Sequence, residues 1–147
     1  MDLNFLKEIV DYGIIGVLGL MSFLSVWFYF ERLWFFKQVD IKTYSLKERL
    51  EIDLTNNISI ISSFASNSVY IGLLGTVFGI IITFLAMGES GNIDVKIIMS
   101  SLGLALKATA MGLIVAIPSM MFYNHLARQI EVKLSLWEIE QKENSAA

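Results

Sequence analysis

Apolar residues gather in three long runs along this chain, and shorter polar segments separate the runs. The runs cover residues 12–30, 69–88 and 99–123, and Lys107 is the only charged residue in any of them. Placed on a helix, each run is about long enough to cross the hydrocarbon core of a bilayer, which is roughly 30 Å thick. Four aromatic residues close the first run at residues 27–30, as expected at a membrane–water interface. The pattern predicts an all-α membrane protein with three transmembrane helices.

The polar segments predict where helices extend beyond the membrane. Residues 31–53 mix five basic with five acidic residues, and Ser45 and Glu48 have the spacing of a capping box at the start of a short helix. Apolar positions at helical spacing then predict one rod over 55–88, about 50 Å long at 1.5 Å per residue. Because this rod is longer than the bilayer core, the segment 31–67 should lie in the cytoplasm. A helical stripe predicts a cytoplasmic tail over 124–142, disorder over 142–147, and a single domain, 1–147.

Two short segments complete the chain. Residues 1–11 have apolar positions on one helical side and charges on the other, so they fit either a helix on the membrane surface or a polar leader without fixed structure. They lack the basic start of a cleaved signal peptide. Residues 89–93, with Gly91 and Asn92, predict the turn between the second and third helices.

The distribution of Lys and Arg predicts the orientation. Residues 31–53 and the segment after Tyr123 hold eight of these side chains, whereas the first eleven residues and the turn region hold only Lys7 and Lys96. Since basic residues favour the cytoplasmic side, we expect the N-terminus outside and the C-terminus inside. His125 would then lie at the inner interface.

Small and hydroxyl residues share one face of each of the last two spans. On the second span they are Gly72, Gly75, Thr76, Gly79 and Thr83, and on the third they are Ala105, Ala108, Thr109, Gly112, Ala116 and Ser119. Such faces fit close helix packing, with each hydroxyl bonded to its own helix. They also fit hydroxyl rings that line a proton path in a symmetric oligomer. Pro118 is expected to kink the third helix.

Composition removes several classes of protein. With 55% hydrophobic and 17% charged residues and a mean hydropathy of +0.62, the chain is too apolar for a soluble domain of its size. No Cys and a single His predict no metal site and no cofactor, and no basic stripe suggests nucleic acid. Neither of the last two spans carries Asp or Glu, which disfavours an enzyme. If protons cross the membrane here, a partner must bring the carboxylate.

Two long motifs resemble the signature spans of the MotA/TolQ/ExbB proton channel family. They are Tyr70-Ile-Gly-Leu-Leu-Gly-Thr-Val-Phe-Gly-Ile and Ala105-Leu-Lys-Ala-Thr-Ala-Met-Gly-Leu-Ile-Val-Ala-Ile-Pro with Tyr123-Asn124, and Glu31-Arg32-Leu33 resembles the exit of the first helix. Within the family, the chain looks most like a short ExbB. The resemblance implies a homopentamer in the bacterial inner membrane, with Thr76 and Thr109 at its pore and the N-terminus in the periplasm. It also implies an ExbD-like single-span partner whose Asp carries protons, and a TonB-like protein that this motor drives for uptake across the outer membrane.

The chain departs from the family pattern at two places. A Glu is common five residues before Thr109, where this chain has Leu104, and Val69 replaces the usual Pro. Lys107 stands on an adjacent turn, and it either extends to the outer surface or pairs with an acid of a partner or neighbouring subunit. A TolQ-like role in the Tol-Pal system and a passive structural role in the inner membrane are the alternatives to the ExbB-like function.

Overall fold

Three long helices and two short ones make up the computed structural model, which describes residues 2–91 and 93–147. In chain order they are α1 (Leu3–Gln38), the 3-10 helix η1 (Ile41–Thr43), α2 (Lys47–Thr55), α3 (Ile58–Ser90) and α4 (Val95–Ala146). The long helices α1, α3 and α4 are each long and apolar enough to cross a membrane. This confirms the prediction of an all-helical chain with three long apolar helices.

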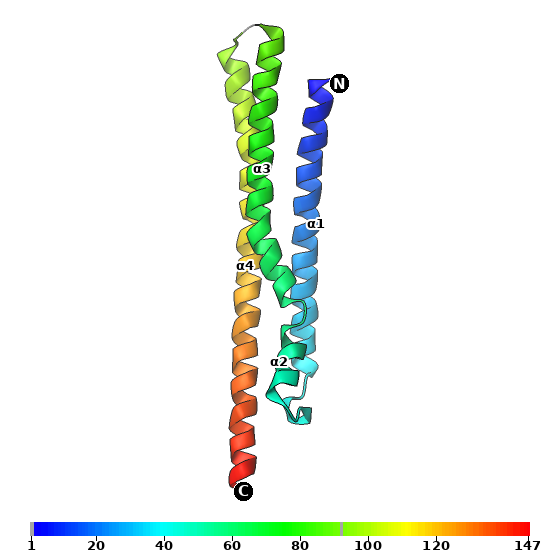
Figure 1. The fold of residues 1–147 in the computed structure, drawn as a ribbon, viewed down its shortest axis with the longest axis vertical. Coiled ribbons are helices and arrows are strands. Elements are labelled where there is room, and N and C mark those ends of the chain that lie inside the picture. Colours follow the sequence, from blue (N-terminus) through cyan, green and yellow to red (C-terminus); the bar gives the residue numbers. More distant parts are fainter. Residues whose placement is uncertain (1, 92) are drawn as a thin grey trace.

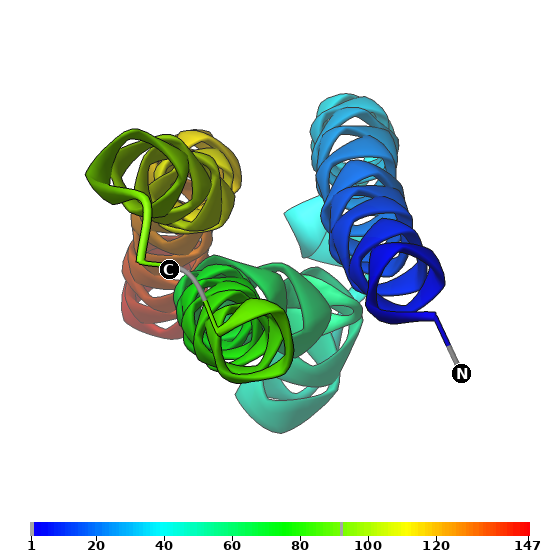
Figure 2. The same cartoon turned by 90° about the horizontal axis from the view of Figure 1, so that it is seen from above.

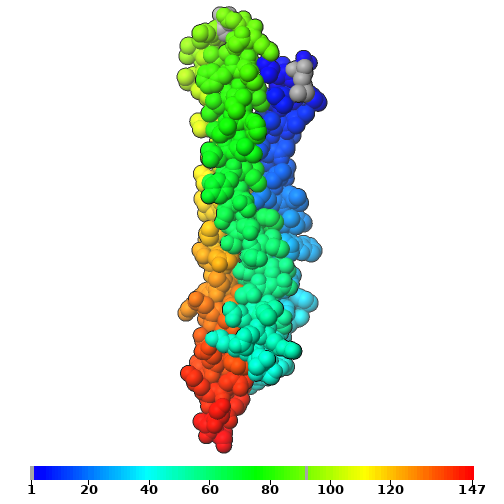
Figure 3. Space-filling view, in the orientation of Figure 1, coloured from blue at the N-terminus to red at the C-terminus, as the bar shows by residue number. Residues whose placement is uncertain are grey.

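The long helices lie side by side in an elongated bundle (Figure 1). Helices α1 and α4 run in the same direction, and α3 runs back between them. Seen from above, α3 and α4 are neighbours and α1 stands to one side (Figure 2). We call the end where α3 and α4 join the hairpin end, and the opposite end the α2 end. Beyond α2, the last part of α4 extends past the rest of the molecule (Figure 3).

Helix ends differ from the predictions in several places. Helix α1 begins at Leu3, so residues 3–11 form neither a separate surface helix nor an unstructured leader. At the other end of the chain, α4 continues to Ala146, so the predicted disorder over 142–147 is wrong. Glu89 and Ser90 belong to α3, and the turn begins only at Gly91, whose φ of 63° favours glycine. Asn92, part of the predicted turn, lies outside the described residues.

The predicted rod over 55–88 is found as α3, but its start lies three residues later. Asn57 adopts a left-handed backbone with φ of 63°, which separates α2 from α3. Asparagine tolerates this conformation better than most residues, so two helices can meet there without a glycine. The predicted capping box is also absent: α2 starts after Leu46, and no side chain caps its first turn.

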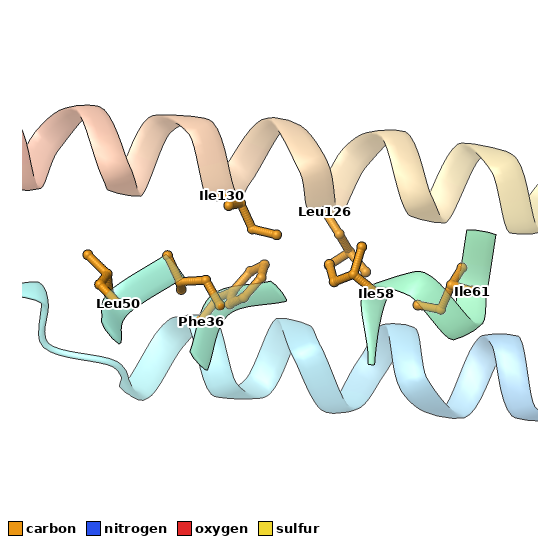
Figure 4. Close-up of a cluster of buried hydrophobic side chains, with 7 residues drawn as sticks. Phe36, Leu50, Ile58, Ile61, Leu126 and Ile130 are labelled. Atoms are coloured by element: carbon orange, nitrogen blue, oxygen red, sulfur yellow. The ribbon is translucent and has the colours of Figure 1, made fainter. Parts of the chain in front are cut away.

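A cluster of buried apolar side chains joins the helices at the α2 end. We call it the α2-end core, and its members are Phe36, Leu50, Leu54, Ile58, Ile61, Leu126 and Ile130. Leu126 and Ile130 point from α4 toward side chains of the α2–α3 segment and Phe36 of α1 (Figure 4). Leu50, Leu54, Ile61 and Leu126 are completely buried. This core joins the end of α1, α2 and the start of α3 to the second half of α4.

Arg32 anchors α1 to the end of α2. Its side chain is only 4% exposed, and Nη1 donates to the carbonyl oxygen of Asp53 at 2.9 Å. Nε and Nη2 donate to the two carboxylate oxygens of Glu31 at 2.7 and 2.6 Å, and these bonds hold the pKa of Glu31 below its ordinary value. The guanidinium also lies 4.5 Å from the ring centre of Phe35. The motif Glu31-Arg32 therefore has a clear structural role in this chain.

Candidate functional site

Thr76 of α3 and Thr109 of α4 face each other across the contact between the two helices. Their hydroxyl oxygens are 2.5 Å apart. Thr76 Oγ1 also donates to the carbonyl oxygen of Ala105 at 3.0 Å, and Thr109 Oγ1 lies 3.4 Å from that of Gly72. Thr76 is 8% exposed, so this hydroxyl pair is nearly enclosed. Thr76 Oγ1 also lies 3.4 Å from the carbonyl oxygen of Gly72 in its own helix, so the hydroxyl pair has backbone acceptors on both helices.

Glycines bring the backbones of α3 and α4 into direct contact around this pair. A Cβ atom added at Gly112 would lie 2.5 Å from the carbonyl oxygen of Ser68, and one at Gly72 would lie 2.7 Å from that of Ala108. At Gly75 and Gly79, an added Cβ would lie 2.7 Å from the methyl groups of Ala108 and Ala105. Real Cβ atoms do not approach so closely, so a larger residue at these positions forces the helices apart. The threonine hydroxyls meet because the glycines allow this spacing.

Thr83 lies apart from the hydroxyl pair, nearer the hairpin end. Its Oγ1 donates to the carbonyl oxygen of Gly79 in its own helix at 2.7 Å. Thr83 also lines a cavity of about 250 Å³ between the hairpin ends of α3 and α4, together with Asp94 and Ser101. Hydroxyl and carboxylate groups therefore line a cavity between the threonine pair and the hairpin end.

Helix α4 continues through Pro118 without a break. The adjacent Ser119 is buried, and its Oγ bonds to the carbonyl oxygen of Val115 and to Oγ of Ser25 in α1, both at 2.8 Å. This second hydroxyl pair links α4 to α1, as the threonine pair links α4 to α3. The sequence analysis missed Ser25, since nothing in the first run distinguishes it from its neighbours.

Lys107 lies two residues before Thr109 on α4 and takes no part in the threonine contacts. It stands twelve residues after Val95, about 18 Å along α4 at 1.5 Å per residue. It lines a small cavity between α1 and α4, and Asp11 of α1 lines the same cavity. Asp11 is the second residue that the sequence analysis missed.

His125 makes contacts that agree with a position at the edge of the bundle. Its Nδ1 is 2.9 Å from the hydroxyl oxygen of Tyr29, and its Nε2 is 3.0 Å from Nε2 of Gln129. Tyr29 also stacks on Phe122 with ring centres 4.3 Å apart. Within the described residues, no group of three or more His, Cys, Asp or Glu side chains could hold a metal ion.

Comparison with known proteins identifies the family. The model of the MotA/TolQ/ExbB proton channel family matches residues 35–139. The biopolymer transport protein ExbB of Aquifex aeolicus is 46% identical over 142 residues, which cover 97% of this chain and 96% of that protein. ExbB of Helicobacter pylori strain J99 is 50% identical over 127 residues, covering 86% of this chain and 88% of that protein. The chain belongs to the MotA/TolQ/ExbB proton channel family.

The part of the chain that matches the family model includes the site described above. The matched residues 35–139 include Thr76, Thr109 and the four close-packed glycines. The Tol-Pal system protein TolQ of Haemophilus influenzae is also similar, at 39% identity, but over 52% of this chain and 34% of that protein. Similarity along almost the whole length is therefore seen with proteins named ExbB. The family is one of transport proteins and not a class of enzymes.

Proposed function

We propose that this chain is the ExbB-like proton-channel subunit of an energy-transducing motor in the bacterial inner membrane. The enclosed hydroxyl pair of Thr76 and Thr109 carries the proposal, because it places two proton-exchanging groups within spans that hold no carboxylate. Thr83, Ser101 and Asp94, which line one cavity, extend this line of polar groups toward the hairpin end. Protons would then pass along the small-residue faces of α3 and α4.

The proposed assembly is a homopentamer around a central pore, lined by α3 and α4. The pore holds the span of an ExbD-like partner, whose Asp supplies the carboxylate that the apolar runs 69–88 and 99–123 lack. A TonB-like protein receives the resulting motion and drives uptake across the outer membrane. The N-terminus and the hairpin end face the periplasm, while α2 and the last part of α4 stand in the cytoplasm. The excess of Lys and Arg in these latter segments supports that orientation.

The length over which this chain aligns with its relatives favours the TonB system over the Tol-Pal system. Alignment with the Aquifex ExbB extends over 96% of that protein, whereas alignment with TolQ extends over 34% of it. A passive structural role is less well supported, because packing alone requires small residues but not two facing hydroxyl groups.

Proton flux through the reconstituted complex tests the proposal. The chain and its ExbD-like partner are placed in liposomes with an internal pH-sensitive dye, and native mass spectrometry gives the ring size. We expect Thr76→Val and Thr109→Val each to lower the flux roughly tenfold or more, since the loss of one positioned polar group commonly costs 1–3 kcal/mol. Thr76→Ser keeps the hydroxyl and should retain most of the flux.

A control separates this effect from loss of folded protein. Thr55 bonds only to carbonyl oxygens within α2, so Thr55→Val should leave both flux and protein amount unchanged. If the Val variants at positions 76 and 109 conduct like the unmodified chain, the hydroxyl pair serves packing alone and the proposed pathway is wrong.

A further inference from the structure

Lys107 needs a counter-charge that the hydroxyl site does not provide. Lysine is costly in the apolar part of a membrane unless it reaches water or an opposite charge. In the single chain its side chain is exposed on the surface of α4. No side-chain carboxylate lies within 4.0 Å of its Nζ among the described residues. The charge must therefore be balanced by a group at a slightly greater distance or by another molecule.

Asp11 of α1 is the acidic side chain that shares a cavity with Lys107. The cavity has a volume of about 80 Å³, and its other walls are the aliphatic or small side chains of Ile14, Ile15, Leu104, Ala108 and Met111. One water molecule occupies about 30 Å³ of the liquid, so the cavity has room for a few. Two opposite charges thus face a small space with otherwise apolar walls.

Packing next to the cavity fixes the position of Asp11 along the helix bundle. Ile14, one turn further along α1, lies against Gly75 of α3, where an added Cβ would approach its side chain to 3.3 Å. Ile14 also packs on the buried cluster of Leu18, Met21 and Val115, which joins α1 to α4. Asp11 is therefore held within about one helical turn of the level of the threonine pair.

We propose that Asp11 and Lys107 form a charge pair within one chain, bridged by water in the cavity between α1 and α4. The acid that balances Lys107 then comes from the first helix of the same subunit and not from a partner or a neighbouring subunit. The pair also brings a carboxylate of this chain close to the hydroxyl site, although the apolar runs 69–88 and 99–123 carry none. Asp11 and Lys107 act as positioning residues, which hold α1 against the helices that form the site.

Cross-linking in the membrane tests the geometry without any assumption about function. The chain contains no Cys, so Asp11→Cys combined with Lys107→Cys gives a protein with two defined thiols. A short bifunctional thiol reagent should join them within one chain, which leaves a monomer-sized band whose thiols no longer react. The matched control combines Lys107→Cys with Tyr12→Cys, because Tyr12 is next in sequence and 74% exposed. Cross-linked dimers would show that position 107 faces a neighbouring subunit and would overturn the proposal.

Charge variants test the pairing itself. Asp11→Asn and Lys107→Met should each lower the Tm of the purified protein by roughly 3 °C, the shift for about 1 kcal/mol in a chain of this size. The double variant should fall no further than the worse single variant, because the coupled interaction is lost only once. The exchanged pair, Asp11→Lys with Lys107→Asp, should recover most of the loss. Lys7→Met serves as control, since Lys7 lines a different cavity. Additive losses, or an unchanged Tm for Asp11→Asn, would contradict the pair.

Uptake in cells adds a readout that rests on the proposed function. In a strain that lacks its own ExbB, each single variant should reduce TonB-dependent uptake roughly fivefold, as a loss of about 1 kcal/mol would give, and the exchanged pair should restore it. If the unmodified chain with its ExbD-like partner supports no uptake, the proposed function fails while the Tm and cross-linking results still decide the pair. If Lys107→Met abolishes uptake and Asp11→Asn does not, the lysine acts toward a partner and the inference is wrong.

Discussion

The helices are held together differently at the α2 end and in the hairpin half, by which we mean the part from Ser68 and Gly112 to the hairpin end. Between α3 and α4, four glycines contact the backbone or an alanine methyl group of the facing helix, and they leave no room for a side chain. At the α2 end, the contacts join large apolar side chains, and Leu50, Leu54, Ile61 and Leu126 are completely buried. The polar groups differ too, because small hydroxyls link the helices in the hairpin half, while Arg32 links α1 to α2.

This difference in packing is expected if water surrounds the α2 end and lipid surrounds the hairpin half. Burying a leucine side chain away from water contributes about 1.5–3 kcal/mol, so large side chains make good contacts where the outside is aqueous. In lipid this gain disappears, and helices associate through close packing and hydrogen bonds, which small residues favour. The position of the change along α3 and α4 is therefore the one expected if the α2 end lies in water, outside the lipid.

The largest effect is expected from a cavity in the α2-end core. Leu54→Ala should lower the free energy of unfolding by about 4 kcal/mol, since Leu→Ala changes at buried sites cost 2–5 kcal/mol. Hydrogen exchange by mass spectrometry should show faster exchange in α2 and the first turns of α3. The neighbouring Ile52 is 68% exposed, so Ile52→Ala should change little. If exchange became equally faster along all of α3, the α2 end and the hairpin half would unfold as one unit. The proposed difference between them would then be wrong.

A smaller effect is expected from one added methyl group in the hairpin half. Gly112→Ala should cost about 2 kcal/mol, because its Cβ meets a backbone oxygen that can move only with its helix. The same change at Gly103, which has open space around it, should stabilise α4 by up to about 1 kcal/mol through helix propensity. Proton flux sharpens the test, since Gly112→Ala should also separate the threonine hydroxyls. If both alanine variants behave alike, close contact at position 112 is not needed.

Hydropathy and spacing were sufficient to predict the helices and the faces that meet. Three apolar runs give three long helices, and the three- and four-residue spacing of Thr76 and the glycines places them on one face whatever the partner is. Helix ends were harder, because α1 and α4 continue through polar residues where hydropathy gives no signal. The break between α2 and α3 depends on the left-handed backbone of Asn57. The other asparagines in the same stretch, Asn56 and Asn67, do not adopt this conformation.

Charged residues with distant partners could not be predicted from one sequence. Arg32 appeared to be an interfacial residue, yet its main contact outside its own helix is the backbone of Asp53, reached only after the chain turns back. Asp11 was expected on the charged side of a surface helix or in a polar leader, and only the parallel packing of α1 on α4 brings it to the cavity of Lys107. Pairings of this kind depend on the register between helices, which hydrophobic periodicity does not define.

The smallest effect is expected from the ion pair between Lys47 of α2 and Glu138 of α4. The hydrogen bond and charge of Lys47 hold the pKa of Glu138 below its ordinary value of 4.5. The stabilisation by this pair is therefore present above pH 4.5 and is lost as the pH falls through the lowered pKa. Both side chains are well exposed, so Glu138→Gln should lower the Tm only slightly at pH 7.

The pH dependence of that small difference shows whether charge or packing is responsible. The Tm of the unmodified chain and of Glu138→Gln should differ at pH 7 and converge in acid, while Glu143→Gln at the exposed end of α4 should match the unmodified chain throughout. A difference that persists below the lowered pKa would mean that Glu138 acts through the packing of its stem beside Trp137, whose indole donates to the carbonyl oxygen of Tyr44. The α2 end would then depend on side-chain packing even at its surface, and its contrast with the hydroxyl-linked hairpin half would be sharper.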